Sequence, residues 1–112
     1  MNKPYLVLDT EAAVERMGDR EMYGEIARAF ARNMGNALRD LTRALREGDM
    51  PAACRFAHSL KGNCDTVGAG NMRQACLRLE QYCREEKADK ARSLFEDLRP
   101  KLLELREILI AL

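Results

Sequence analysis

The sequence predicts an all-α protein, an antiparallel up-down four-helix bundle with a short additional helix at the N-terminus. Apolar residues recur every three or four positions through most of the chain, and strand-like alternation is absent. Glycines and aspartates interrupt this pattern where helices are expected to end and begin. The 112 residues have room for one hydrophobic core, so we expect a single domain over residues 1–112.

A short helix over about 9–17 is expected to precede a long one over about 19–47. Gly18 can close the first helix, and Asp19 can accept hydrogen bonds from the free amides that begin the second. Gly48 can end the long helix in the same way. The apolar residues of the long helix follow steps of three or four, namely Ile26, Phe30, Met34, Leu38, Leu41 and Leu45.

Two further helices, over about 49–66 and 70–87, are separated by Gly68-Ala69-Gly70. Asp49 is the expected N-cap of the first, and Pro51 stands in its first turn, where a missing N–H leaves no bond unmade. Its predicted inward stripe is Ala53, Cys54, Ala57, Leu60, Cys64 and Val67, and that of the second is Met72, Cys76, Leu79 and Cys83.

The last helix is expected over about 89–112, with Asp89 as its cap. It has the most regular apolar stripe of the chain, formed by Ala91, Leu94, Leu98, Leu102, Leu105, Leu109 and Leu112. Pro100 falls inside this helix and removes one backbone hydrogen bond, so we expect a kink near residues 96–99.

The overall charge balance and the N-terminus exclude several classes of protein. With 19 basic and 18 acidic residues the net charge is +1, which favours neither nucleic acid nor an anionic membrane as a partner. Aromatic residues make up only 5% of the chain, which disfavours a β-sandwich. The apolar stretch near the N-terminus is too short for a signal peptide or a membrane span. We therefore expect a cytoplasmic protein, and a monomer.

The four cysteines, Cys54, Cys64, Cys76 and Cys83, lack the close Cys-x-x-Cys pairs of zinc and redox motifs. We expect reduced and mostly buried thiols. A metal or redox site built from them and His58 is an alternative. It is disfavoured because Cys54 and Cys64 fall on the inward stripe and His58 does not, so no metal is expected.

His58 is the only histidine, and it lies about 150° from the centre of its helix's apolar stripe, so it points outward. An exposed histidine is commonly an ordinary surface residue. Here, however, Lys61 and Gly62 follow three and four residues later and share its surface. Glycine inside a helix costs about 1 kcal/mol relative to alanine, which suggests that a large partner must approach His58 closely.

These neighbours suit phosphoryl chemistry. A neutral imidazole is a competent nucleophile toward phosphorus, and the ammonium of Lys61 can neutralise phosphoryl oxygens. The chain has no phosphate-cradling glycine-rich loop of the ATP-binding kind and no kinase signature. We therefore expect a carrier of phosphoryl groups that is not an enzyme with its own ATP site.

The motif Ala57-His58-Ser59-Leu60-Lys61-Gly62, followed by Val67-Gly68-Ala69 and Cys76-Leu77-Arg78-Leu79-Glu80, resembles the signature of histidine-containing phosphotransfer (HPt) domains of bacterial two-component phosphorelays. The resemblance covers nearly the whole chain. It implies that His58 exchanges a phosphoryl group with the aspartate of a response-regulator receiver domain, with Lys61 holding the phosphoryl oxygens and a sensor histidine kinase as a possible further partner. It implies no cofactor on this chain, since Mg²⁺ would belong to the receiver.

Glu80 is the polar residue expected nearest to His58 on the neighbouring helix. At about 1.5 Å rise per residue, His58 is level with roughly residues 77–81 across the turn. The resemblance implies that Glu80 orients the imidazole or binds the ammonium of Lys61, and the alternative is a solvated charge on the outer face. The charged stretch Arg84 to Lys87 replaces a glycine-containing turn of the family and is expected to be a solvated helix end or loop.

The alternative function for this surface is a helical docking module that is never phosphorylated. Such a protein would use the same face for binding alone. The presence of His58, Lys61 and Gly62 together favours phosphotransfer over this alternative.

Overall fold

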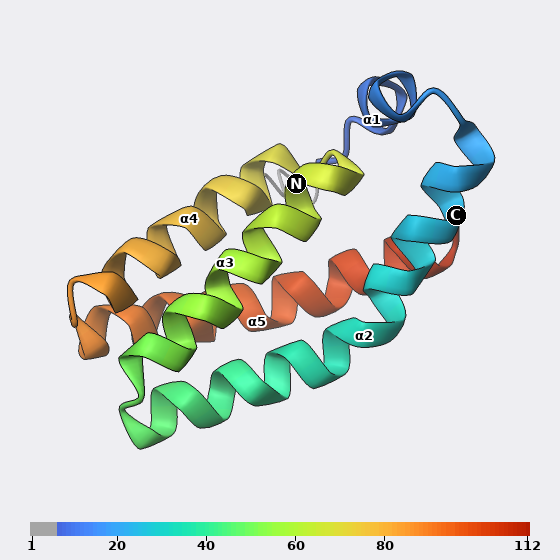
Figure 1. Ribbon diagram of the computed structural model, residues 1–112. Helices are drawn as coiled ribbons and strands as arrows, with labels where there is room; N and C mark the ends of the chain where they lie inside the picture. Colours follow the sequence, from blue (N-terminus) through green and yellow to red (C-terminus); the bar gives the residue numbers. More distant parts are fainter. Residues whose placement is uncertain (1–6) are drawn as a thin grey trace.

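The structure is a computed structural model that describes residues 7–112 and contains, within that range, five α-helices and no strand. Helices α2 to α5 form an up-and-down bundle, and α1 lies across one end of it (Figure 1). The bounds are α1 Thr10–Met17, α2 Arg20–Glu47, α3 Met50–Val67, α4 Gly70–Arg84 and α5 Ala88–Ile110. The predicted all-α fold is confirmed. The first six residues, which include the start of the N-terminal apolar stretch, lie outside the described range.

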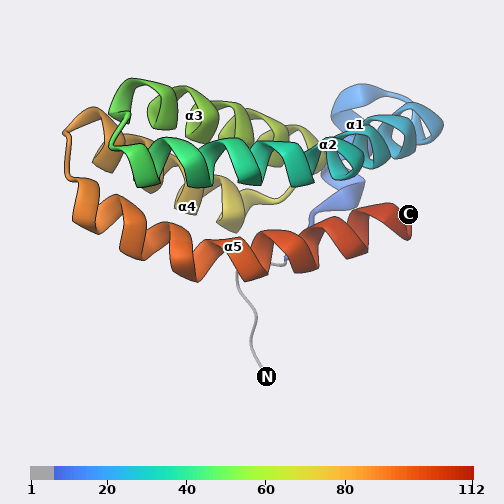
Figure 2. The ribbon, with the colours of Figure 1, turned by 90° about the horizontal axis from the view of Figure 1, so that it is seen from below.

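Each helix of the bundle packs against the next in sequence, and α5 closes the ring against α2. The α3–α4 pair has the most extensive contact, and α1 packs on α2 and α3. Seen from below, α2 and α5 run side by side (Figure 2). The bundle therefore has two opposite edges, one formed by α3 and α4 and the other by α2 and α5. None of the described helices is both long and apolar enough to cross a bilayer.

Aspartates begin the first three helices and glycines end them. The carboxylate of each aspartate accepts a hydrogen bond from a backbone amide of the following first turn, and each glycine takes the left-handed conformation that a side chain disfavours. The predicted roles of Asp19, Asp49, Gly18 and Gly48 are confirmed. Asp9 and Gly68 complete the set.

The junction between α4 and α5 differs from the prediction. Helix α4 ends at Arg84, three residues earlier than expected, and Lys87 is the N-cap of α5. The expectation that Asp89 caps α5 is therefore wrong, because Asp89 lies within the first turn. Glu86 occupies the left-handed region with φ 57°, where glycine is usual, and so reverses the chain after α4.

The core follows the predicted stripes with four corrections. Ile26 and Leu112 are 37% and 45% exposed, and Cys54 and Leu94 are only partly buried. Phe95 takes the inward position expected for Leu94. Both residues fit the helical spacing between buried Ala91 and buried Leu98, and the packing of the core selects Phe95. The remaining stripes interlock between the four long helices and exclude solvent.

Helix α5 continues through Pro100 to Ile110 without interruption. Proline lacks the N–H that would donate to the carbonyl four residues earlier, so one backbone hydrogen bond of the helix is missing there. Figure 2 shows α5 as a curved helix, and the kink near residues 96–99 stays a prediction.

The α3–α4 turn is anchored by the N-terminal part of the chain. The backbone N–H of Asp9 donates to the carbonyl of Gly68 at 2.8 Å. In the interior, the hydroxyl of Tyr23 donates to the carbonyl of Val67 at 2.8 Å. These two bonds fix the turn that sets the register of α3 against α4, and the candidate site lies across that register.

Candidate functional site

His58 lies on the outer face of α3, and its side chain is 65% exposed. Its neighbours on the helix, Ala57 and Leu60, fill the core and leave the imidazole outside it. The outward orientation predicted from the helical periodicity is confirmed. The ring makes no contribution to the core, which leaves it free for chemistry at the surface.

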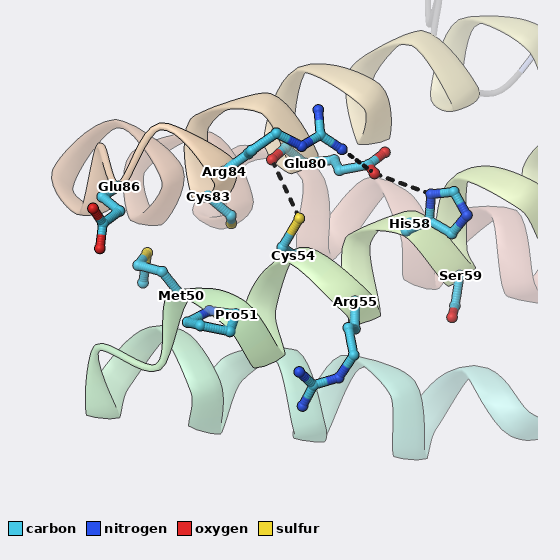
Figure 3. A pocket seen from close by; sticks show the side chains of 10 residues that line it. All are labelled: Met50, Pro51, Cys54, Arg55, His58, Ser59, Glu80, Cys83, Arg84 and Glu86. Atoms are coloured by element: carbon cyan, nitrogen blue, oxygen red, sulfur yellow. Dashed lines mark hydrogen bonds and ion pairs between the residues drawn. The ribbon is translucent and has the colours of Figure 1, made fainter.

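The imidazole is held by one hydrogen bond from its inner nitrogen. Nδ1 of His58 lies 3.0 Å from Oε2 of Glu80. An ionised carboxylate can only accept, so Nδ1 carries the proton and donates it. The lone pair of the neutral ring then resides on Nε2. Figure 3 shows the ring with Nδ1 toward Glu80 and its other nitrogen turned away.

Glu80 is buried, with 4% of its side chain exposed, although its partners reach solvent. Oε1 lies 2.9 Å from Nζ of Lys61, and Oε2 lies 2.8 Å from Nη2 of Arg84. Glu80 therefore contacts both His58 and Lys61, as expected from the register of the two helices. The alternative of a solvated outer charge is wrong, because the side chain lies in the α3–α4 groove beneath these partners.

Opposing effects act on the pKa of Glu80. Burial raises the pKa of the carboxyl, but the hydrogen bonds from Lys61 and His58, together with the positive charge of Lys61, outweigh it and hold the pKa below its ordinary value. Glu80 is thus ionised at neutral pH. It can act as the anionic acceptor for Nδ1–H throughout the physiological range.

Lys61 and Gly62 lie one helical turn from His58, as predicted. The side chain of Lys61 is only 24% exposed, and its ammonium is held near the imidazole by the ion pair with Glu80, which also binds His58. Gly62 is exposed, and a methyl group at its Cα would meet no atom within 4 Å. No packing within the chain requires glycine at this position.

Arg84 belongs to the site, although the sequence interpretation assigned it to a solvated helix end. Its guanidinium, 60% exposed, binds Glu80 from one turn further along α4. The signal was present, since Glu and Arg four residues apart on a helix are placed to form an ion pair.

A hollow of about 660 Å³ lies between α3 and α4 beside His58 (Figure 3). Its lining includes Met50, Pro51 and Cys54 from α3, and His58 and Arg84 stand among its polar groups. The exposed area within it is mainly apolar. The imidazole thus borders a concave surface of the kind that buries part of a binding partner.

The four cysteines are free thiols, and three of them are buried. A hydrogen bond with Cys76, together with burial, raises the pKa of the Cys64 thiol. Burial, with the charges of Cys54 and Glu80, raises the pKa of Cys83 to about 11. Thiols are weak nucleophiles and poor ligands until they ionise. Among residues 7–112, no group of three or more His, Cys, Asp or Glu side chains is arranged to hold a metal ion.

Comparison with known proteins assigns the chain to a family. A family model described as the Hpt domain matches residues 25–112, which include the whole of α3, α4 and α5. The chain belongs to the Hpt domain family. All four predicted site residues of this Hpt domain lie within the matched range.

One curated relative of this Hpt domain is the "Phosphorelay intermediate protein rdeA" of Dictyostelium discoideum, which is 24% identical over 92 residues. The matched region is 82% of this chain and 36% of the relative, so the Hpt domain spans little more than a third of that protein's length. No solved structure matches the chain.

Proposed function

We propose that this Hpt domain is a histidine phosphotransfer protein, in which His58 accepts a phosphoryl group from an aspartate-bearing receiver domain and donates it to another. The hydrogen bond between Nδ1 of His58 and Glu80 carries the proposal. It fixes the tautomer that leaves the Nε2 lone pair available on an exposed ring. The family and the phosphorelay relative support the same role.

In the proposed transfer, the Nε2 lone pair attacks the phosphorus of a phosphoaspartate. The N–P bond forms as the P–O bond to the aspartyl carboxyl breaks, and the aspartate leaves as a carboxylate. The ring acquires positive charge, which the carboxylate of Glu80 stabilises through Nδ1–H. The reverse sequence returns the phosphoryl group to a receiver.

Lys61 is proposed to bind the phosphoryl oxygens, since its ammonium is held next to the ring by Glu80. Gly62 is proposed to give the receiver steric access, because no side chain stands above the helix there. Arg84 adds a second positive charge beside the same carboxylate. Together these groups offset the negative charge that a phosphoryl group brings to the surface.

The role proposed is that of a carrier without an ATP site. Its partners would be receiver domains and a sensor histidine kinase in the cytoplasm, and Mg²⁺ would be supplied by the receiver. A monomer suffices, since all four proposed site residues come from one α3–α4 hairpin.

The position of the phosphoryl group tests this chemistry. After incubation with a phosphorylated receiver and Mg²⁺, the phosphohistidine should give the phosphorus NMR signal of the Nε2 isomer. A signal from the Nδ1 isomer would show that Glu80 does not direct the reaction. If several receivers leave the chain unlabelled, the docking-module alternative is favoured.

A further inference from the structure

Eight of the chain's arginines lie along the α2–α5 edge of the bundle, opposite to the edge that holds His58. This arginine face consists of Arg28, Arg32, Arg39, Arg43 and Arg46 of α2 with Arg92, Arg99 and Arg106 of α5. We propose that it is a second docking surface, which binds an acidic region of a partner protein. The proposal goes beyond phosphotransfer and does not rest on it.

Helical geometry places each set of arginines on a single stripe. On α2 they are separated by four, seven, four and three residues, and on α5 by seven and seven. With about 3.6 residues per turn, such spacings keep side chains on one face of a helix. The stripe on α2 is about 18 residues long, or about 27 Å at 1.5 Å per residue.

Three hydrogen bonds show that the two stripes lie beside each other. Arg92 Nε donates to the carbonyl of Leu45 at 2.8 Å, and Arg106 Nε donates to that of Ala31 at 3.3 Å. From the other helix, Arg28 Nη1 reaches the carbonyl of Leu112 at 3.4 Å. Arginines from both helices thus line the seam between α2 and α5, and Figure 2 shows these helices running side by side.

The positive charge of this face is largely unbalanced. Within the described residues, its only ion pairs are those of Arg92 with Asp89 and Arg106 with Glu107, both exposed. The five arginines that α2 contributes to the face form none among the described residues. On the α3–α4 edge, three of the five lysines and arginines, Lys61, Arg73 and Arg84, pair with a carboxylate. The face also carries the carboxylates of Glu25 and Glu96, each three residues before one of its arginines, but its eight arginines outnumber its carboxylates and give this edge an excess of positive charge.

This arrangement opposes helix stability. Arg28 and Arg32 stand four residues apart, as do Arg39 and Arg43, and like charges at this spacing destabilise a helix. An anionic partner would remove the repulsion on binding.

The composition of the face favours a protein over a nucleic acid. Arginine is enriched and lysine depleted in protein interfaces, and the face contains no lysine. The guanidinium matches a carboxylate with two parallel hydrogen bonds. Leu103 and Ile110 follow Arg99 and Arg106 by four residues and are 40% and 42% exposed, which adds apolar area on the same side. Carboxylates alternating with apolar side chains fit this surface.

Binding of a defined peptide tests the proposal. The probe is a fluorescent helical peptide of about 20 residues with glutamates and leucines on one face. Its affinity for the protein is measured by fluorescence anisotropy at about 150 mM salt. The affinities of a DNA duplex of equal charge and of phosphatidylserine vesicles are measured separately for comparison. Wild type is expected to bind the peptide more tightly than the DNA or the vesicles. R39E/R43E is expected to bind the peptide about tenfold more weakly than wild type does. L103S should also weaken peptide binding.

The matched control is R78E/K90E, which lowers the net charge equally at exposed positions away from the face. It should retain wild-type affinity within about twofold. R39Q/R43Q provides a milder pair if the reversal impairs folding, which circular dichroism would show. Equal losses in both double variants, tighter binding of DNA or vesicles, or no peptide binding by wild type would overturn the proposal. Phosphoryl acceptance should be unchanged in R39E/R43E, so this result is independent of the His58 assignment.

Discussion

At the scale of single residues, the site depends on one buried carboxylate. Glu80 accepts a hydrogen bond from His58, forms ion pairs with Lys61 and Arg84, and leaves the reactive nitrogen of the imidazole exposed. The three partners come from two helices, so the cluster also fastens α3 to α4. Loss of the negative charge should therefore affect both stability and reactivity.

Glu80→Gln tests the charge while preserving the shape of the side chain. Because the folded-state pKa of Glu80 is lowered, its contribution to stability is present above its ordinary pKa of 4.5 and is lost as the pH falls through the folded value. Wild type should therefore be more stable than Glu80→Gln at pH 7, by about 1 to 2 kcal/mol. Denaturant titrations from pH 7 downward should show this difference shrinking below about pH 4.5. A difference that does not change with pH would contradict it.

Gly62→Ala should change the stability of the protein and the receiver's access to His58 in opposite directions. The added methyl group meets no atom within 4 Å, and alanine is favoured over glycine in a helix by about 1 kcal/mol, so the melting temperature should rise. Phosphoryl transfer from a receiver should nevertheless be slower, because the methyl group obstructs the partner. A rate equal to that of wild type in stopped-flow or gel assays would remove the proposed role of Gly62.

The sequence predicts the residues of the site better than their contacts. The spacing of His58, Lys61 and Gly62 within one helix and the register of Glu80 across a short turn follow from regular geometry. The burial of Glu80 does not, because it depends on how side chains from two helices fill the groove between them. Its ion pair with Arg84, by contrast, is predictable from their spacing of four residues on one helix.

At the scale of helices, the boundaries marked by aspartate and glycine are the predictable ones. The α4–α5 junction lacks both signals, and Glu86 adopts there a conformation that glycine takes more easily. Local sequence therefore does not reveal where α4 ends. The exchange of Phe95 for Leu94 in the core is similar, since both fit the periodicity and packing decides between them.

Glu86→Gly should relieve backbone strain at this junction. A non-glycine residue in the left-handed region is disfavoured by about 1 to 2 kcal/mol, part of which is offset by the greater freedom of glycine in the unfolded chain. The expected net gain in unfolding free energy is about 0.5 to 1 kcal/mol in urea titrations. Glu85→Gly is the control, since φ of Glu85 is −84° and glycine should bring no gain there. Equal effects of the two substitutions would contradict the assignment of strain to Glu86.

Leu79→Ala tests the packing of α4. Leu79 is fully buried next to Glu80, so truncation leaves a cavity in the core. The expected loss in unfolding free energy is about 2 to 5 kcal/mol. Leu77→Ala, on a half-buried position of the same helix, should cost less. An unchanged melting temperature for Leu79→Ala would show that the inward register is wrong.

At the scale of the whole molecule, the bundle separates two surfaces. The α3–α4 edge carries the histidine, its carboxylate and an adjoining hollow, and the α2–α5 edge carries the arginine face. The all-α architecture is predictable because apolar periodicity and capping signals agree along most of the chain. The clustering of arginine on one edge appears only when two helices distant in sequence are placed side by side.

The central claim is that His58 carries a phosphoryl group, and acceptance of label from a phosphorylated receiver domain with Mg²⁺ tests it most directly. Wild type should acquire an acid-labile, base-stable label. His58→Gln should acquire none while melting at nearly the same temperature, because the ring is exposed and lies outside the core. Label on His58→Gln, or none on wild type with several receivers, would contradict the account.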